Sequence, residues 1–361
     1  MVAETIFSTM TRIAQQTGAI NLGQGFPNEQ GPASMLARAQ EEIASGNNQY
    51  APGRGFEVLR QAVAADRGGF YTPDEVLITV GATEGLAATI LALTSPGDEV
   101  ILIEPHYDAY AAVIAMAGAT MIPVPMTPDF RPDIAAVAAA VGPRTRAILI
   151  NTPHNPTGIM FTREETEAVA EIARRHNIFV ISDEVYEKFP FDGRQHIPIA
   201  TLPGMKERTI TISSAAKMLR CTGWKTGWVM ATPELIDAIV EVKQYLTFVG
   251  ASPFQPAIAQ ALMEEQAWIG QAAASMQKRR DLLRRALEAA GYPTYGAEGG
   301  YFILAECDVD AMVDKGIVGI PVSAFVSSGT TRFDNLVRFA LCRSDEDIAK
   351  AARILAPQLL N

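Results

Sequence analysis

Residues 147–158 have the sequence AILINTPHNPTG, in which an apolar run passes directly into a polar loop that contains prolines. Four other segments, 76–80, 100–103, 178–181 and 209–212, show the same kind of apolar run followed by polar or small residues. The runs are continuous rather than alternating, which is typical of strands that are covered on both faces. These segments are therefore predicted to be strands of one mainly parallel sheet.

Segments with helical periodicity lie between most of these runs. The clearest spans 163–176, where Thr162 and Glu165 form a capping-box pattern. A second is expected from Pro233 to Leu246, with Thr232 as its N-cap. Strands and helices in alternation predict an α/β fold with helices on both faces of the sheet. A long amphipathic segment at 268–290 and short apolar runs at 301–305 and 336–341 predict a smaller α+β unit.

The composition excludes some classes of protein. The chain has 361 residues, of which 48% are hydrophobic, so it has enough apolar material to form a large core. Its formal net charge is −10, and no run of lysines and arginines forms a basic patch. Such a surface repels phosphate backbones, so we expect no nucleic-acid partner. No stretch of about 20 residues is uniformly apolar, so we expect no membrane span.

Cysteine usage and the N-terminal segment indicate the compartment. Cys221, Cys307 and Cys342 are widely spaced and form neither a disulfide framework nor a metal-binding motif. The segment MVAETIFSTMTR lacks the basic region and apolar core of a secretory signal. We therefore expect a cytoplasmic protein without a metal site.

The residues directly after the predicted strands are candidates for a ligand site, because ligands bind beyond the carboxyl ends of parallel strands. Gly81-Ala82-Thr83 opens a predicted helix, whose free N–H groups favour an anion. Asp183 follows an apolar strand and would need a cationic or protonated partner there. Lys217 follows another strand in a stretch of small residues. Burial would make its amine nucleophilic, and Lys225 could add a cation or bind phosphate.

Four motifs then occur in a specific order: NPTG at 155–158, DEVY at 183–186, SAAK at 214–217 and GWKTGW at 223–228. With them, the chain resembles the pyridoxal-phosphate-dependent aminotransferases of fold type I, class I and II. The resemblance runs from NLGQGFP at 21–27 to VRF at 337–339. It implies a large cofactor-binding domain over 34–266 and a small domain formed by 1–33 and 267–361. Within the family, the chain looks most like the kynurenine, glutamine and methionine aminotransferases, and the run at 207–218 also resembles actinobacterial N-succinyldiaminopimelate aminotransferases.

The resemblance implies a role for each catalytic residue. Lys217 would bond covalently to the aldehyde of pyridoxal phosphate and, once freed by the substrate amine, act as the general base. Asp183 would pair with the pyridine nitrogen and keep it protonated. Tyr186 and Asn155 would hydrogen-bond to the hydroxyl oxygen of the ring.

The resemblance also implies how cofactor and substrate are bound. The phosphate would be held by the backbone N–H groups of Ala82 and Thr83, the Ser214 hydroxyl and Lys225, a position where many relatives have arginine. Tyr107 would stack on the ring. The substrate α-carboxylate would be bound by Arg338, helped by Asn155 and the Gly25 backbone N–H, and Phe7 would line the side-chain pocket. Tyr50 would reach the phosphate of a neighbouring subunit, which implies a homodimer.

The expected reaction is a ping-pong transfer of the amino group from an L-amino acid to a 2-oxo acid, either 2-oxoglutarate or pyruvate. N-succinyldiaminopimelate, glutamine, methionine and kynurenine all remain open as amino donors. A C–S β-lyase on the same fold is one alternative. A catalytically silent cofactor-binding regulator and a nicotinamide-dependent oxidoreductase are others, although no complete GxGxxG motif supports the last.

Overall fold

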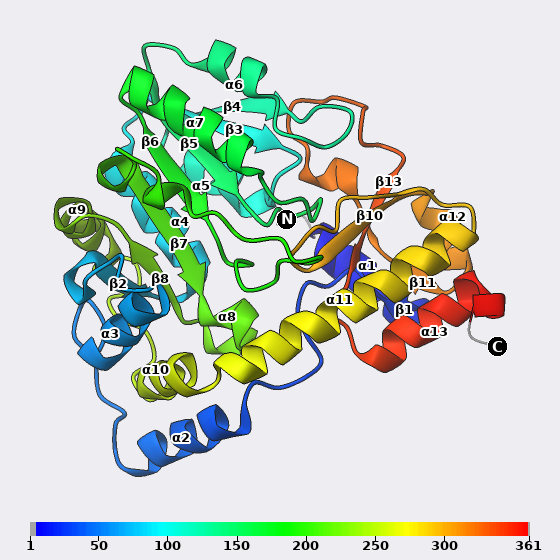
Figure 1. Ribbon diagram of the computed structural model, residues 1–361, viewed down its shortest axis with the longest axis horizontal. Helices are drawn as coiled ribbons and strands as arrows, with labels where there is room; N and C mark the ends of the chain where they lie inside the picture. Colours follow the sequence, from blue (N-terminus) through cyan, green and yellow to red (C-terminus); the bar gives the residue numbers. More distant parts are fainter. Residues whose placement is uncertain (1–4, 360–361) are drawn as a thin grey trace.

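A seven-stranded sheet forms the centre of the molecule in the computed structural model, which describes residues 5–359. Its strand order is β2-β8-β7-β6-β5-β3-β4 (Figure 1). The pairs β7–β6, β6–β5, β5–β3 and β3–β4 are parallel, whereas β8 runs antiparallel to both its neighbours. The strands are β2 (Val76–Thr79), β3 (Glu99–Glu104), β4 (Thr120–Pro125), β5 (Thr145–Asn151), β6 (Phe179–Asp183), β7 (Thr209–Ser214) and β8 (Gly227–Met230).

Both faces of this sheet are covered, as the continuous apolar runs predicted. Val100 and Leu102 of β3 pack in one core cluster, whereas Ile101 and Ile103 pack in another on the opposite face. The first face is covered by α4 (Gly81–Leu93), α5 (Asp108–Met116) and α9 (Pro233–Lys243), and the second by α6 (Ile134–Ala140) and α7 (Arg163–His176). The α/β fold with a mainly parallel, helix-flanked sheet is therefore confirmed.

A four-stranded antiparallel sheet, in the order β12-β13-β10-β9, forms the second part of the fold. The strand β1 pairs with β11 in a separate two-stranded sheet, so the N-terminal segment lies against the C-terminal part of the chain (Figure 1). The strands are β1 (Ile20–Asn21), β9 (Thr294–Tyr295), β10 (Phe302–Glu306), β11 (Ile317–Val318), β12 (Ile320–Pro321) and β13 (Leu336–Ala340).

The remaining helices connect and cover the two parts. The longest, α11, crosses from the large sheet to the small one in Figure 1. These helices are α1 (Ile6–Thr17), α2 (Ala33–Ala44), α3 (Glu57–Asp66), α8 (Ala215–Met218), α10 (Phe254–Glu264), α11 (Gln266–Ala289), α12 (Val309–Asp314) and α13 (Asp345–Leu355). Within residues 5–359, every helix is too short or too polar to cross a bilayer.

Local sequence signals fix some of the element boundaries but not others. The capping box of Thr162 and Glu165 is present at the start of α7. Thr232, in contrast, makes no side-chain cap hydrogen bond, and α9 ends at Lys243 instead of Leu246. After Lys243 the chain continues in turns, where the backbone N–H of Leu246 donates to the carbonyl oxygen of Lys243 and the buried Lys243 side chain donates to that of Phe248 at 2.5 Å. The edge strand β4 was not predicted, since its sequence TMIPVP contains two prolines and is only partly buried.

Candidate active site

One cavity of about 340 Å³ opens at the carboxyl ends of the parallel strands. It gathers nearly all of the residues that the sequence singled out, although they come from elements far apart in the chain. Tyr50 is the exception, because it is 81% exposed and its ring contacts Phe248 outside this cavity. The predicted residues that line the cavity are Phe7, Gly25, Ala82, Thr83, Tyr107, Asn155, Asp183, Tyr186, Ser214, Lys217, Lys225 and Arg338.

Asp183 is the last residue of β6 and is buried at the bottom of the cavity. Its Oδ2 accepts a hydrogen bond from the Tyr110 hydroxyl at 2.7 Å, and its Oδ1 accepts one from the Val185 backbone N–H at 3.2 Å. Burial raises the pKa of Asp183 to about 6, although the hydrogen bond from Tyr110 opposes this shift. No cation of the described residues forms an ion pair with this carboxylate, so a positively charged ligand atom would be stabilised beside it.

Lys217 lies on the short helix α8, directly after β7. Its Nζ is 6.0 Å from the ring centres of both Tyr186 and Tyr301 and makes no hydrogen bond or ion pair with residues 5–359. Burial lowers the pKa of the Lys217 ammonium, and Cys342 and Asp183 oppose this shift, whereas the positive charges of Lys225 and Arg338 add to it. A larger share of the side chain is therefore neutral amine, the form that acts as a nucleophile or base.

The N-terminus of α4 lines the cavity together with Lys225. Gly81 has φ = 72°, and an added Cβ there would lie 3.3 Å from Lys225 Nζ. Gly227 of β8 is pressed against the same turn, since a Cβ on it would lie 2.7 Å from the backbone nitrogen of Ala82. Backbone N–H groups at a helix start and a nearby ammonium are the usual elements of a phosphate site.

Arg338 is buried on β13 among aromatic rings. Its guanidinium carbon lies 4.0 Å from the ring centre of Phe302, 4.7 Å from that of Phe325 and 5.5 Å from that of Phe7. Burial lowers the pKa of Arg338 to about 10. Its buried Nε has no partner, and no carboxylate of the described residues pairs with the guanidinium, so this side chain can take an anionic ligand.

The orientation of Asn155 follows from Arg338. Arg338 Nη1 donates to Asn155 Oδ1 at 2.8 Å, and Nη2 donates to the carbonyl oxygen of Gly23 at 2.8 Å. Because the guanidinium can only donate, the amide oxygen of Asn155 must face it and the amide nitrogen faces elsewhere. The NH₂ group of Asn155 is thus left to donate to a ligand.

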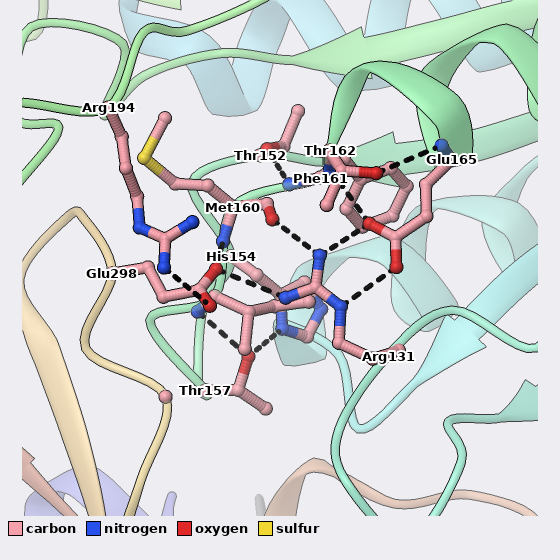
Figure 2. Close-up of polar contacts among 12 residues, drawn as sticks. Arg131, Thr152, His154, Thr157, Met160, Phe161, Thr162, Glu165, Arg194 and Glu298 are labelled. Carbon is pink, nitrogen blue, oxygen red and sulfur yellow. Dashed lines mark hydrogen bonds and ion pairs between the residues drawn. The ribbon is translucent and has the colours of Figure 1, made fainter.

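The segment from Thr152 to Thr162 is held by a network centred on Arg131, as Figure 2 shows, and Asn155 belongs to the same segment. Arg131 Nε donates to Glu165 at 2.8 Å, Nη2 donates to the carbonyl oxygen of Met160 at 2.8 Å, and Nη1 pairs with Glu298 at 3.1 Å. Glu298 in turn accepts the backbone N–H of Met160 at 2.8 Å. The network joins α7, this loop and the segment before β10.

A second charged cluster lies next to Asp183. Arg67 donates to Glu184 at 3.0 Å and also pairs with Glu187, and His196 Nε2 lies 3.0 Å from Glu184. The ligand atoms of Glu184, Glu187 and His196 are close enough together to bind a metal ion. Arg67 already forms ion pairs with both carboxylates, however, so we interpret the cluster as a structural ion network next to the cavity.

Glu104, at the end of β3, contacts a segment of the C-terminal part. Its Oε1 accepts the backbone N–H groups of Ser327 at 2.6 Å and Ser328 at 3.0 Å. The backbone N–H of His106 donates to the carbonyl oxygen of Phe325 at 2.8 Å. Since the ring of Phe325 lies on Arg338, these hydrogen bonds connect the large sheet to the surroundings of the arginine.

Several residues of the cavity were not singled out from the sequence. Tyr110, Gln24, Phe302 and Thr222 line it, and Tyr301 donates from its hydroxyl to the carbonyl oxygen of Lys217 at 2.7 Å. Tyr110 could have been found, because it follows the predicted site residue Tyr107 by three positions at a helix start and thus shares its face. The others carry no local signal.

Comparisons with known proteins agree with this geometry. Residues 17–355 match the family described as aminotransferase class I and II. The chain is 47% identical to a probable N-succinyldiaminopimelate aminotransferase of Mycobacterium tuberculosis, over 98% of this chain and 96% of that protein. It is 36% identical to a methionine aminotransferase of Escherichia coli, over 97% and 95%. The solved structure of N-succinyldiaminopimelate aminotransferase from M. tuberculosis superposes with a TM-score of 0.94, covering 98% of this chain and 97% of that one.

Proposed function

The chain belongs to the class I and II aminotransferases, which are pyridoxal-phosphate-dependent enzymes of fold type I, and on that basis we propose how its cavity performs amino transfer. One observation carries the proposal. Within residues 5–359, the buried Asp183 forms no ion pair with a cation and Arg338 forms none with a carboxylate, and both line the same cavity as the amine of Lys217. Each group lacks what a phosphopyridine and an amino acid would supply.

The residues present fit the cofactor. Asp183 would pair with a protonated ring nitrogen, because its burial without a cation is otherwise unfavourable. The phosphate would be held by the backbone N–H groups of Ala82 and Thr83, the hydroxyl of Ser214 and the ammonium of Lys225. Tyr107 would stack on the ring, and the amide of Asn155 and the phenol of Tyr186 would donate to the ring oxygen. When bound, pyridoxal phosphate supplies an electron sink that makes the substrate Cα–H bond acidic.

Lys217 is the proposed base. Burial lowers the pKa of its Nζ, which would accept the proton from the substrate Cα. The same amine would then donate that proton to C4′ of the cofactor. The lysine would also bind the cofactor covalently between turnovers. The hydroxyl of Tyr301 donates a hydrogen bond to the backbone carbonyl oxygen of Lys217 at 2.7 Å. This contact helps to hold the lysine in position.

Arg338 is the proposed site for the α-carboxylate of both substrates. Its partners Asn155 and Gly23 are neutral and hold the guanidinium plane in place, while the three aromatic rings exclude water. The backbone N–H of Gly25 would complete the carboxylate site. The backbone of Gly25 closely approaches the ring of Phe302, because a Cβ on Gly25 would lie 2.9 Å from a ring carbon. Phe7 would line the pocket for the substrate side chain.

We propose N-succinyldiaminopimelate as the amino donor, or in the reverse direction as the product. The support is the 47% identity to a relative that bears this activity in its name. A broader specificity for methionine or kynurenine is the second candidate. Relatives named methionine aminotransferase, 36% identical, and kynurenine–oxoglutarate transaminase 3 of Bos taurus, 34% identical, support it. The acceptor would be 2-oxoglutarate or pyruvate.

We further propose a cytoplasmic homodimer with a large domain over 34–266 and a small domain formed by 1–33 and 267–361. Tyr50, which is 81% exposed, packs its ring on the exposed Phe248, and Tyr245, three residues before Phe248 in the chain, is 85% exposed. A second copy would cover these exposed rings. In that dimer Tyr50 would complete the phosphate site of the other subunit. Tyr50→Phe should then weaken cofactor binding without changing the oligomeric state, measured by cofactor titration and light scattering.

The decisive test uses the purified protein loaded with pyridoxal phosphate. Adding an amino donor alone should shift the cofactor absorbance to shorter wavelength, and adding a 2-oxo acid should restore it. A panel of donors and acceptors ranked by kcat/KM then identifies the substrates. Release of pyruvate, ammonia and thiol without an acceptor would instead identify a β-lyase. The Lys217→Ala variant must lose turnover; if it does not, the proposed role of Lys217 is wrong.

A further inference from the structure

Gln24 lies on the wall of the cavity where a substrate side chain would extend. It follows Gly23, whose carbonyl oxygen accepts a hydrogen bond from Arg338, and it lines the cavity together with Phe7 and Phe26. A substrate whose α-carboxylate is bound by Arg338 would direct its side chain past these residues. Gln24 offers the only side-chain amide among the three.

The contacts of Gln24 fix which way its amide faces. Nε2 lies 3.1 Å from the carbonyl oxygen of Phe7 and 2.6 Å from Oγ1 of Thr11, both on α1. The carbonyl oxygen can only accept, so the group beside it must be the NH₂ of Gln24. The hydroxyl proton of Thr11 is itself donated to the carbonyl oxygen of Phe7 at 2.8 Å, so Oγ1 accepts from Gln24 as well.

Both amide protons of Gln24 are therefore used on α1. Its Oε1 is at the other end of the amide group and makes no hydrogen bond with any residue from 5 to 359. Because Gln24 lines the cavity and both donors of its amide are engaged on α1, this half-buried side chain has only an acceptor left for a ligand. A rotation of the amide would place Oε1 against the carbonyl oxygen of Phe7, which opposes it.

We propose, on the basis of the proposed function, that Gln24 determines specificity by accepting a hydrogen bond from an N–H group on the side chain of the amino donor. The site then favours donors that carry an amide, such as a primary carboxamide or an N-acyl amine, over equally long donors that carry only oxygen acceptors. An ester oxygen facing Oε1 would leave both acceptors unpaired, whereas an N–H satisfies them. Phe7 and Phe26 would pack against the apolar stem of the same side chain.

The test compares donors that differ only in this N–H group. One pair is L-glutamine and L-glutamate γ-methyl ester, and a longer pair is Nε-acetyl-L-lysine and its O-acetyl analogue, 6-acetoxy-L-norleucine. The cofactor-loaded wild-type enzyme should use the amide of at least one pair about tenfold better in kcat/KM, the size expected for one satisfied hydrogen bond. Gln24→Met, which keeps the length but removes the acceptor, should reduce that ratio to about one.

Thr11→Val is the matched control, because it removes one anchor of the amide but leaves the Oε1 acceptor in place. It should retain the preference for the amide. L-Alanine, whose side chain does not reach Gln24, provides the reference rate for each variant. A wild-type enzyme with no amide preference in either pair, or a Gln24→Met variant that slows alanine and the amides equally, would overturn the proposal. Loss of transamination with every donor, alanine included, would instead refute the proposed function.

Discussion

The hydroxyl of Tyr110 and the carboxylate of Asp183 form a buried hydrogen bond of 2.7 Å beneath the cavity. The two residues come from α5 and β6, which are 73 positions apart at this contact. Tyr110 also packs edge-on against Tyr107, with ring centres 5.6 Å apart, so it contacts both the proposed stacking residue and the proposed partner of the ring nitrogen. We therefore propose that Tyr110 positions both of these residues.

Replacing Tyr110 by Phe should weaken the cofactor site without unfolding the protein. The phenol stabilises the ionised form of Asp183, so its removal should raise the pKa of that carboxyl further and weaken the pairing with a protonated ring. We expect the Kd for pyridoxal phosphate to rise about tenfold, the effect of one charge-assisted hydrogen bond. Fluorescence titration measures it, and an unchanged Kd and unchanged kcat would contradict the assigned role.

The cofactor-free protein should become more stable when Asp183 is replaced by Asn. The pKa of Asp183 is raised to about 6 in the folded protein, so the folded state holds this proton more tightly than the unfolded chain. The free energy of unfolding therefore falls as the pH rises from about 4 to about 6. Above that range, the protein is less stable than at low pH by about 2–3 kcal/mol. Urea unfolding of both proteins should give equal stability at pH 4 and a more stable Asp183→Asn at pH 8, although this variant loses transaminase activity.

Replacing Arg338 by Lys should affect the substrates more than the cofactor. Lysine keeps the charge but loses the planar fork that is held by Asn155 and Gly23 among three rings. We expect kcat/KM to fall about 100-fold for amino donors, while the Kd for pyridoxal phosphate changes little. Arg353→Lys on the exposed face of α13 is the control. An equal loss in both variants would show that the effect is not specific to the site.

Gly227 and Gly223 provide a matched pair of substitutions near the proposed phosphate site. A Cβ on Gly227 would lie 2.6 Å from the backbone carbon of Gly81, whereas nothing lies within 4 Å of one on Gly223. Gly227→Ala must push the start of α4 away from β8, so we expect it to cost about 1–3 kcal/mol and to weaken phosphate binding. Thermal unfolding and cofactor titration should show this loss for Gly227→Ala and almost none for Gly223→Ala.

The sequence was most informative where the local pattern alone decides the structure. The apolar runs became β2, β3, β5, β6 and β7 because strands buried on both faces need no polar alternation, and Thr162 and Glu165 fixed the start of α7. The resemblance to a family selected residues that do line one cavity. Their chemical roles stay predictions until they are tested by substitution.

What the sequence could not predict depends on contacts between distant segments. The surroundings of Arg338 combine Phe7, Phe302 and Phe325 from three separate elements, and no spacing in the chain reveals that they meet. The orientation of Gln24 depends likewise on α1 lying beside it. Tyr50 lies outside the cavity of a single chain, so its predicted role cannot be read from one copy.

The hydrogen bonds from Ser327 and Ser328 to Glu104 connect the surroundings of Arg338 to the end of β3. The ring of Phe325, which covers Arg338, lies two residues from the first of these serines. A displacement of this segment would break both hydrogen bonds to Glu104 and would also move the ring of Phe325 away from the guanidinium. The position of the serines and the burial of Arg338 therefore depend on each other.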